Sequence, residues 1–149
     1  MREAGMFMDN NGSSTKLEDV VQQVFIAAPP DKVWEAVATS EGIAAWFMPN
    51  DFQAELGHVF HLEAGPFGKS RCEVIELDPP NRLAFSWDKD WTVTFQLEET
   101  AGGTNFTLTH GGWDENTATS FGEKHAVVRE RMAGGWVGIV KKLAEYAGQ

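Results

Sequence analysis

The chain has little of several residue types, and each shortage excludes a class of protein. Cys72 is the single cysteine, so no internal disulfide and no cysteine cluster around a metal can form. Lysine and arginine number 12 against 22 aspartate and glutamate residues, which gives a net charge of −10. An acidic surface repels phosphate backbones and anionic membranes. We therefore expect no nucleic-acid partner.

Long apolar runs are also lacking. None approaches the roughly 20 residues of a membrane-spanning helix, and the first residues have no apolar stretch of the signal-peptide kind. We expect a cytoplasmic protein without a membrane partner. The polar residues 1–16 are expected to be a flexible leader, followed by a single domain over residues 17–149.

The order of the predicted elements indicates an α+β fold. Residues 20–27 are apolar and partly β-branched, which predicts a strand. After Pro29 and Pro30, apolar residues at helical spacing predict a helix, and residues 43–47 predict a second short helix with Ser40 as its N-cap. Residues 59–63, 71–77, 82–87, 92–98 and 105–110 predict successive strands separated by turn residues, typical of an antiparallel meander.

The C-terminal part is predicted to be helical. Apolar residues recur at steps of three and four from Val128 to Leu143, within a helix expected over about residues 117–146. His125 is expected to be exposed near its start. Gly134, Gly135 and Gly138 each cost a helix about 1 kcal/mol relative to alanine. We expect that close approach to the sheet, or room for a ligand, offsets this cost.

Five local features occur in the order typical of one known family. They are Ala28 to Trp34 followed by Trp46, Gly57 to Phe60, Glu73 to Trp87, Gly103 to His110, and Gly135-Trp136 followed by Leu143. With them the chain resembles the helix-grip superfamily, also called SRPBCC or START-like. Within it the chain is similar to homologues of the activator of the ninety-kilodalton heat-shock-protein ATPase. The resemblance implies a curved antiparallel sheet wrapped around a long C-terminal helix, often with a cavity between them.

The aromatic residues are the candidates for lining that cavity, because rigid apolar rings make good pocket walls. With six tryptophans and ten phenylalanines, the chain could fill this space as an ordinary core or leave room for a small hydrophobic or aromatic molecule. His110 shares the side of its predicted strand with Phe106 and Leu108, which is the side expected to face inward. It could orient a polar end of the ligand. The candidate lining residues are Trp46, Phe60, Phe85, Trp87, Phe95, Phe106, His110, Met132 and Trp136. No metal-ligand spacing is present, and no cofactor is predicted.

Two other functions remain open, and so does a homodimer. The chain could be a protein-interaction module that activates a chaperone, but the family's eukaryotic co-chaperones carry a larger N-terminal domain where this chain has a short leader. A chaperone partner is therefore not expected. It could instead be a cyclase- or hydrolase-like enzyme, for which Glu63 or Glu73 with His110 would be the acid–base pair. We expect a non-enzymatic binding domain.

Overall fold

The computed structural model describes residues 15–65, 68–119 and 122–149. Most of the predicted leader, residues 1–14, lies outside the described residues. At its end, Thr15 Oγ1 donates a hydrogen bond to Asp114 Oδ2 at 2.9 Å, and Lys16 pairs with Asp114 in an isolated antiparallel bridge. Among the described residues, no helix combines the length and the hydrophobicity that a membrane span requires.

Six strands form one antiparallel sheet in the order β2-β7-β6-β5-β4-β3. The first strand in the chain therefore pairs with the last. The strands are β2 (Val20–Ile26), β3 (Val59–Glu63), β4 (Lys69–Asp78), β5 (Arg82–Trp87), β6 (Trp91–Thr100) and β7 (Gly103–Gly111). Alternate side chains of β6 and β7 are buried on one face, as the period of two predicts.

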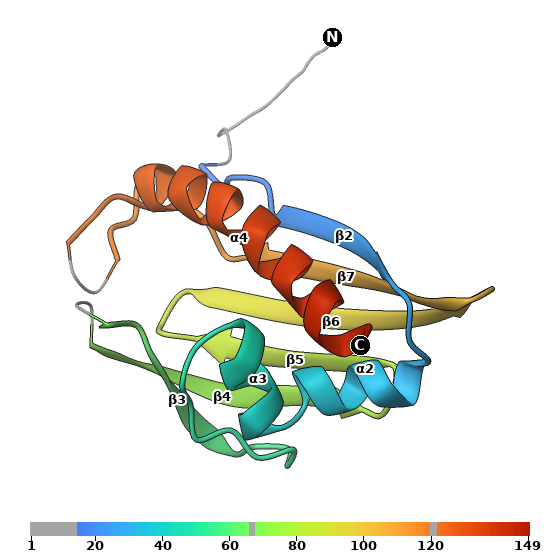
Figure 1. Cartoon of the computed structure of the whole chain (residues 1–149). Coiled ribbons are helices and arrows are strands. Elements are labelled where there is room, and N and C mark those ends of the chain that lie inside the picture. Colours follow the sequence, from blue (N-terminus) through green and yellow to red (C-terminus); the bar gives the residue numbers. More distant parts are fainter. Residues whose placement is uncertain (1–14, 66–67, 120–121) are drawn as a thin grey trace, which may run out of the picture.

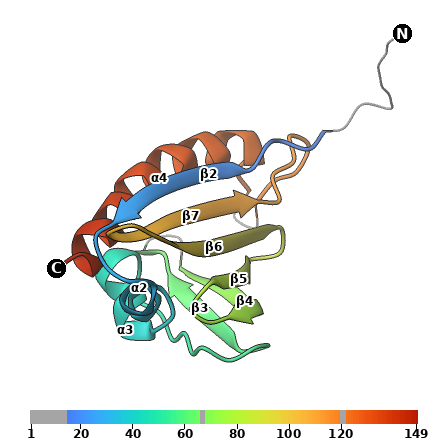
Figure 2. The ribbon, with the colours of Figure 1, turned by 90° about the vertical axis from the view of Figure 1, so that its right-hand side faces the viewer.

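Three helices cover one face of the curved sheet (Figures 1 and 2). They are α2 (Pro30–Val37), α3 (Ser40–Trp46) and the long α4 (His125–Ala147). α2 and α3 lie beside the C-terminal half of α4, whereas the N-terminal half of α4 extends past them toward the end of the sheet (Figure 1). This arrangement confirms the predicted helix-grip fold.

The cap of α3 differs from the prediction. Thr39, rather than Ser40, is the N-cap, because its hydroxyl accepts a hydrogen bond from the Gly42 amide at 3.0 Å. Ser40 instead donates to the carbonyl of Asn50 at 2.8 Å.

The start of α4 also differs from the prediction. The helix begins at His125 rather than near Thr117. Before it, Ala118 and Lys124 pair as an antiparallel bridge, and Gly122 has a φ of +90°, which is far from helical backbone. The chain therefore folds back on itself before it enters the helix.

The expected role of the helix glycines is wrong. A Cβ atom added at Gly134, Gly135 or Gly138 would meet nothing within 4 Å, so none of the three approaches the sheet closely. All three are exposed on the outer side of α4. The predicted apolar stripe faces the sheet, with Val128, Trp136, Val140 and Leu143 buried.

Candidate functional site

The centre of the molecule is a solid aromatic core. Trp46 packs on Phe95 with ring centroids 5.7 Å apart, and Phe95 contacts Phe85 at 5.7 Å and Phe106 at 5.5 Å. Phe60 extends this network through Phe85 at 5.3 Å. Each of these rings is at most 2% exposed. Five of the nine predicted lining residues therefore pack on one another in the core between the helices and the sheet.

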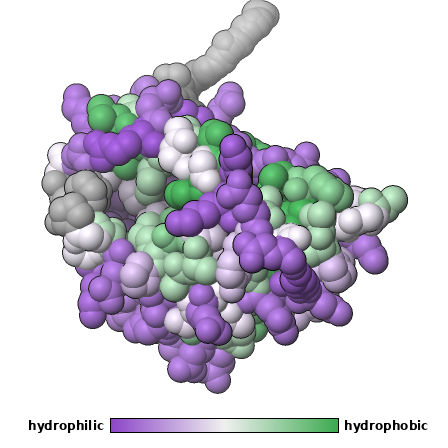
Figure 3. Space-filling view, in the orientation of Figure 1, coloured by the Kyte–Doolittle hydropathy of each residue, from purple (hydrophilic) through white to green (hydrophobic). Residues whose placement is uncertain are grey.

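A cavity of about 360 Å³ lies at one end of this core. Its walls are Met48 after α3, the facing ends of β3 and β4, the β5–β6 hairpin, and the first two turns of α4. The lining residues are Met48, Glu63, Ala64, Ser70, Trp87, Trp91, Val128, Arg131 and Met132. Figure 3 shows the surface hollowed on the left, where Figure 1 places the N-terminal end of α4 opposite the β3–β4 end.

Two of the predicted residues, Trp87 and Met132, line this cavity. His110 and Trp136 are not on its wall but contact Trp87, with ring centroids 5.4 and 6.4 Å away. The cavity therefore has an aromatic wall and a second layer of rings behind it.

His110 is an uncharged hydrogen-bond acceptor in this second layer. It is fully buried, and the indole Nε1 of Trp136 donates to its Nδ1 at 2.9 Å. Since Nδ1 accepts, the proton of the neutral ring is on Nε2. Burial, with a smaller contribution from the nearby His125, lowers the pKa of His110 from 6.5 to about 3. In the structure Nδ1 of His110 is bonded to an indole rather than to Glu63 or Glu73, the acid–base partners that the alternative enzyme reading would require.

His125, which we expected to be exposed, is buried at the start of α4. Only 1% of its surface is accessible. Its Nδ1 accepts from the amide of Asp114 at 3.1 Å, and its Nε2 lies 3.3 Å from Asp90 Oδ2. Its ring packs against Trp91 and Trp113. His125 therefore fixes the first turn of α4 to two loops at the end of the cavity.

Charged side chains stand at the cavity mouth. Exposed Arg131 makes two hydrogen bonds to the carboxylate of Glu123, at 2.5 and 3.0 Å. This pairing raises the pKa of Arg131 and lowers the pKa of Glu123. Glu63 is exposed on the opposite side. Among the described residues, the apolar interior is therefore bordered by the Arg131–Glu123 ion pair and by the carboxylate of Glu63.

Sequence reasoning missed Trp91, Val128 and Met48 as lining residues. Trp91 could have been found, because it has the same strand parity as Val93 and Phe95, which point inward. Val128 was identified as part of the apolar stripe but not as a cavity residue. Met48 follows α3 in a segment without periodicity, so its position depends on the tertiary structure.

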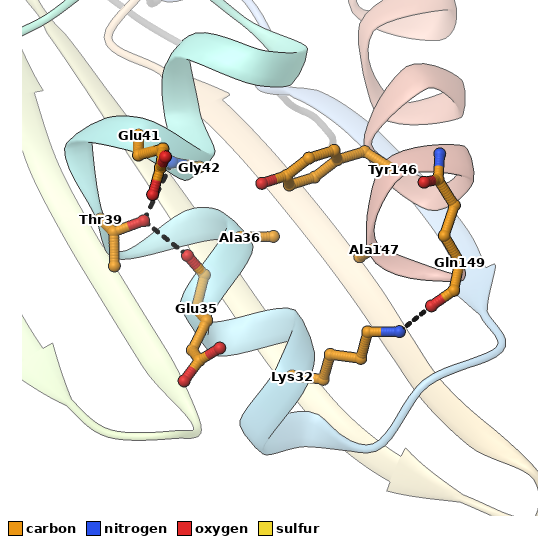
Figure 4. A pocket seen from close by; sticks show the side chains of 9 residues that line it. All are labelled: Lys32, Glu35, Ala36, Thr39, Glu41, Gly42, Tyr146, Ala147 and Gln149. Carbon is orange, nitrogen blue, oxygen red and sulfur yellow. Dashed lines mark hydrogen bonds between the residues drawn. The ribbon is translucent and has the colours of Figure 1, made fainter.

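A second hollow of about 470 Å³ lies between α2, α3 and the end of α4 (Figure 4). Much of its lining is polar, and several of these groups already bond one another. Thr39 Oγ1 donates to the carbonyl of Glu35 at 2.7 Å, and Lys32 donates to the backbone carbonyl of Gln149. We favour the cavity under α4 because its aromatic and aliphatic walls match a small-molecule site more closely.

A curved antiparallel sheet that holds a long C-terminal helix, with a cavity at one end of their shared core, defines the helix-grip class. Within that class, the model of the family described as "Activator of Hsp90 ATPase homolog 1-like protein" matches residues 27–148. The chain belongs to this family.

Solved structures agree with this assignment. Protein BH1534 from Bacillus halodurans is 47% identical, with a TM-score of 0.80 over 91% of this chain and 99% of that one. DynU16, from the dynemicin biosynthetic locus, is 25% identical, with a TM-score of 0.70 over 87% of this chain and 46% of that one. No curated protein matches the chain.

More distant structures share the fold. The Aha1 protein from Colwellia psychrerythraea, solved as a dimer, is 18% identical, with a TM-score of 0.73 over 89% of this chain and 97% of that one. At this identity the likeness concerns the fold alone.

Proposed function

We propose that the chain binds a small hydrophobic or aromatic molecule in the cavity under the N-terminal half of α4. The observation that carries this proposal is the composition of the wall, where Trp87, Trp91, Val128, Met48 and Met132 surround about 360 Å³. Ligand sites are typically concave, mostly apolar and of this size range. The likeness to DynU16, a protein of a biosynthetic locus, supports a role with a small molecule.

The surroundings of His110 favour binding over acid–base catalysis. A general base works best when its pKa lies near the working pH, whereas burial lowers the pKa of His110 to about 3. Its Nδ1 is also occupied by Trp136. The carboxylate on the cavity wall, Glu63, is exposed at the mouth rather than buried beside the imidazole.

The test is a titration of the full chain with a fluorescent naphthalene-type probe. We expect saturable binding with a Kd in the micromolar range, about −8 kcal/mol. Met132→Phe should fill part of the cavity and weaken binding at least about tenfold, because overpacking leaves less room for the probe. Val137→Phe is the matched control, since Val137 is 53% exposed on the same helix. No saturable binding to the wild type, or equal loss in both variants, would refute the proposal.

A homodimer and a chaperone-activating module are the alternatives that the sequence left open, and no stimulation of a chaperone ATPase is expected. The Aha1 structure from Colwellia psychrerythraea is a dimer, and edge strand β2 of this chain exposes Val21 and Phe25 by 56% and 50%. Light scattering after size exclusion gives the assembly state. A chaperone ATPase assay with added protein addresses the chaperone-activating role named by the family.

A further inference from the structure

Buried indole N–H groups fall into two sets in this structure. The N–H of Trp46 donates to the carbonyl of Ala36, that of Trp113 donates to the carbonyl of His110, and that of Trp136 donates to His110 Nδ1. Among the described residues, the N–H groups of Trp87 and Trp91 have no acceptor, although both atoms are fully buried. These two indoles are the ones that line the cavity.

A third donor lies in contact with both. His110 Nε2 is buried and also lacks a partner among the described residues, and it carries the ring proton because Nδ1 accepts from Trp136. The His110 ring stacks on Trp87 at 5.4 Å and meets Trp91 edge-to-face at 5.2 Å. The two indoles are themselves 5.6 Å apart. Three N–H donors without acceptors are therefore grouped in one cluster of touching rings.

Folded proteins pair nearly all buried N–H groups, because an unpaired one costs its full desolvation. Three such groups in one cluster, beside a cavity, are not explained by packing, since other residues could supply the same apolar area. Their shared property is that each donates and none accepts. The cluster is therefore suited to a molecule that brings acceptor oxygen into an otherwise apolar space.

We propose that the indole N–H groups of Trp87 and Trp91, on the cavity wall, form a hydrogen-bonding site for an uncharged oxygen acceptor, such as a carbonyl, on an apolar ligand, with the third donor, His110, in the layer of rings behind them. This inference rests on the proposed function and narrows the class of ligand. The acceptor is uncharged because burying an anion is costly unless a cation accompanies it. Among the described lining residues, the one cation, Arg131, is already paired with Glu123, and the other charged residue, Glu63, is itself a carboxylate.

The experiment compares three probes of similar shape on the full chain: methyl naphthyl ketone, ethylnaphthalene and naphthoate. The ketone should bind at least tenfold more tightly than the hydrocarbon, which corresponds to about 1.4 kcal/mol. It should also bind more tightly than naphthoate. In proton–nitrogen NMR spectra, the indole N–H signals of Trp87 and Trp91 should move downfield with the ketone but not with the hydrocarbon.

Single indole N–H groups are then removed while an aromatic ring is kept. Trp91→Phe should reduce the preference for the ketone by about threefold or more, since one donor is lost. Trp46→Phe is the control, because its N–H is already bonded to Ala36 in the core. That variant should keep the full preference.

Each outcome bears on a different claim. Equal binding of the ketone and the hydrocarbon, with no change in the indole N–H signals, would overturn the hydrogen-bonding site but not the apolar cavity. Ordered water would then be the partner of the buried N–H groups. Tightest binding of naphthoate would overturn the uncharged acceptor. Failure of all three probes to bind would refute the proposed function itself.

Discussion

The burial of His110 makes a quantitative prediction about acid sensitivity. The folded-state pKa of about 3 lies below the ordinary histidine value of 6.5, so the unfolded chain binds this proton more readily than the native chain does. Stability is then fully present above pH 6.5 and is lost as the pH falls toward the folded-state pKa. Between pH 7 and pH 5 this single group should lower the free energy of unfolding by about 2 kcal/mol.

The pH range from 7 to 5 distinguishes the effect of His110 on stability from that of the carboxylates. The pKa values of Asp51, Asp114 and Glu123 are also lowered, from ordinary values of 3.8, 3.8 and 4.5. Their effects on stability therefore lie mostly below pH 5. A loss of stability between pH 7 and pH 5 must come mainly from histidine.

The assay is urea unfolding of the wild type and His110→Gln at both pH values. Each protein is compared with itself, so any general destabilisation by the substitution cancels. The difference between the two pH values should shrink by about 2 kcal/mol in His110→Gln. An unchanged difference in His110→Gln, or an imidazole NMR signal of His110 that titrates near pH 6, would refute the reasoning.

Two further predictions concern stability and thiol reactivity. Gly134→Ala and Gly138→Ala should each stabilise the protein by up to about 1 kcal/mol, because an added Cβ atom meets nothing and alanine favours the helix. Thermal and urea melts measure the change. A loss of stability would show that these glycines have a role other than packing. Gly112→Ala is the contrasting control and should destabilise, since its φ is +95° and its Cβ would lie 2.1 Å from the carbonyl oxygen of Asp90. Burial raises the pKa of the fully buried Cys72 thiol, so a thiol reagent at pH 8 should modify it in urea but not in the native state. Rapid labelling of Cys72 in the native state would contradict its burial.

Much of the fold could be predicted from local patterns. Strand parity placed Phe85, Trp87 and Phe106 on the inner face because successive side chains of a strand point to opposite sides. The spacing along α4 likewise predicted the burial of Trp136 and Val140. These features depend only on backbone geometry within a single element.

The division of the aromatic rings between core and cavity was decided by the tertiary structure. Phe95 and Trp91 both point to the inner face of β6, but Phe95 is packed in the core and Trp91 lines the cavity. What distinguishes them is the position of α3 and α4 over the sheet, which covers one ring fully and leaves space beside the other. His125 was misjudged for the same reason, because its hydrogen-bond partners, Asp114 and Asp90, lie 11 and 35 residues earlier in the chain and meet it only in the fold. A sequence pattern specifies which way a side chain points, whereas the elements packed against it determine whether that direction leads into a core or into a cavity.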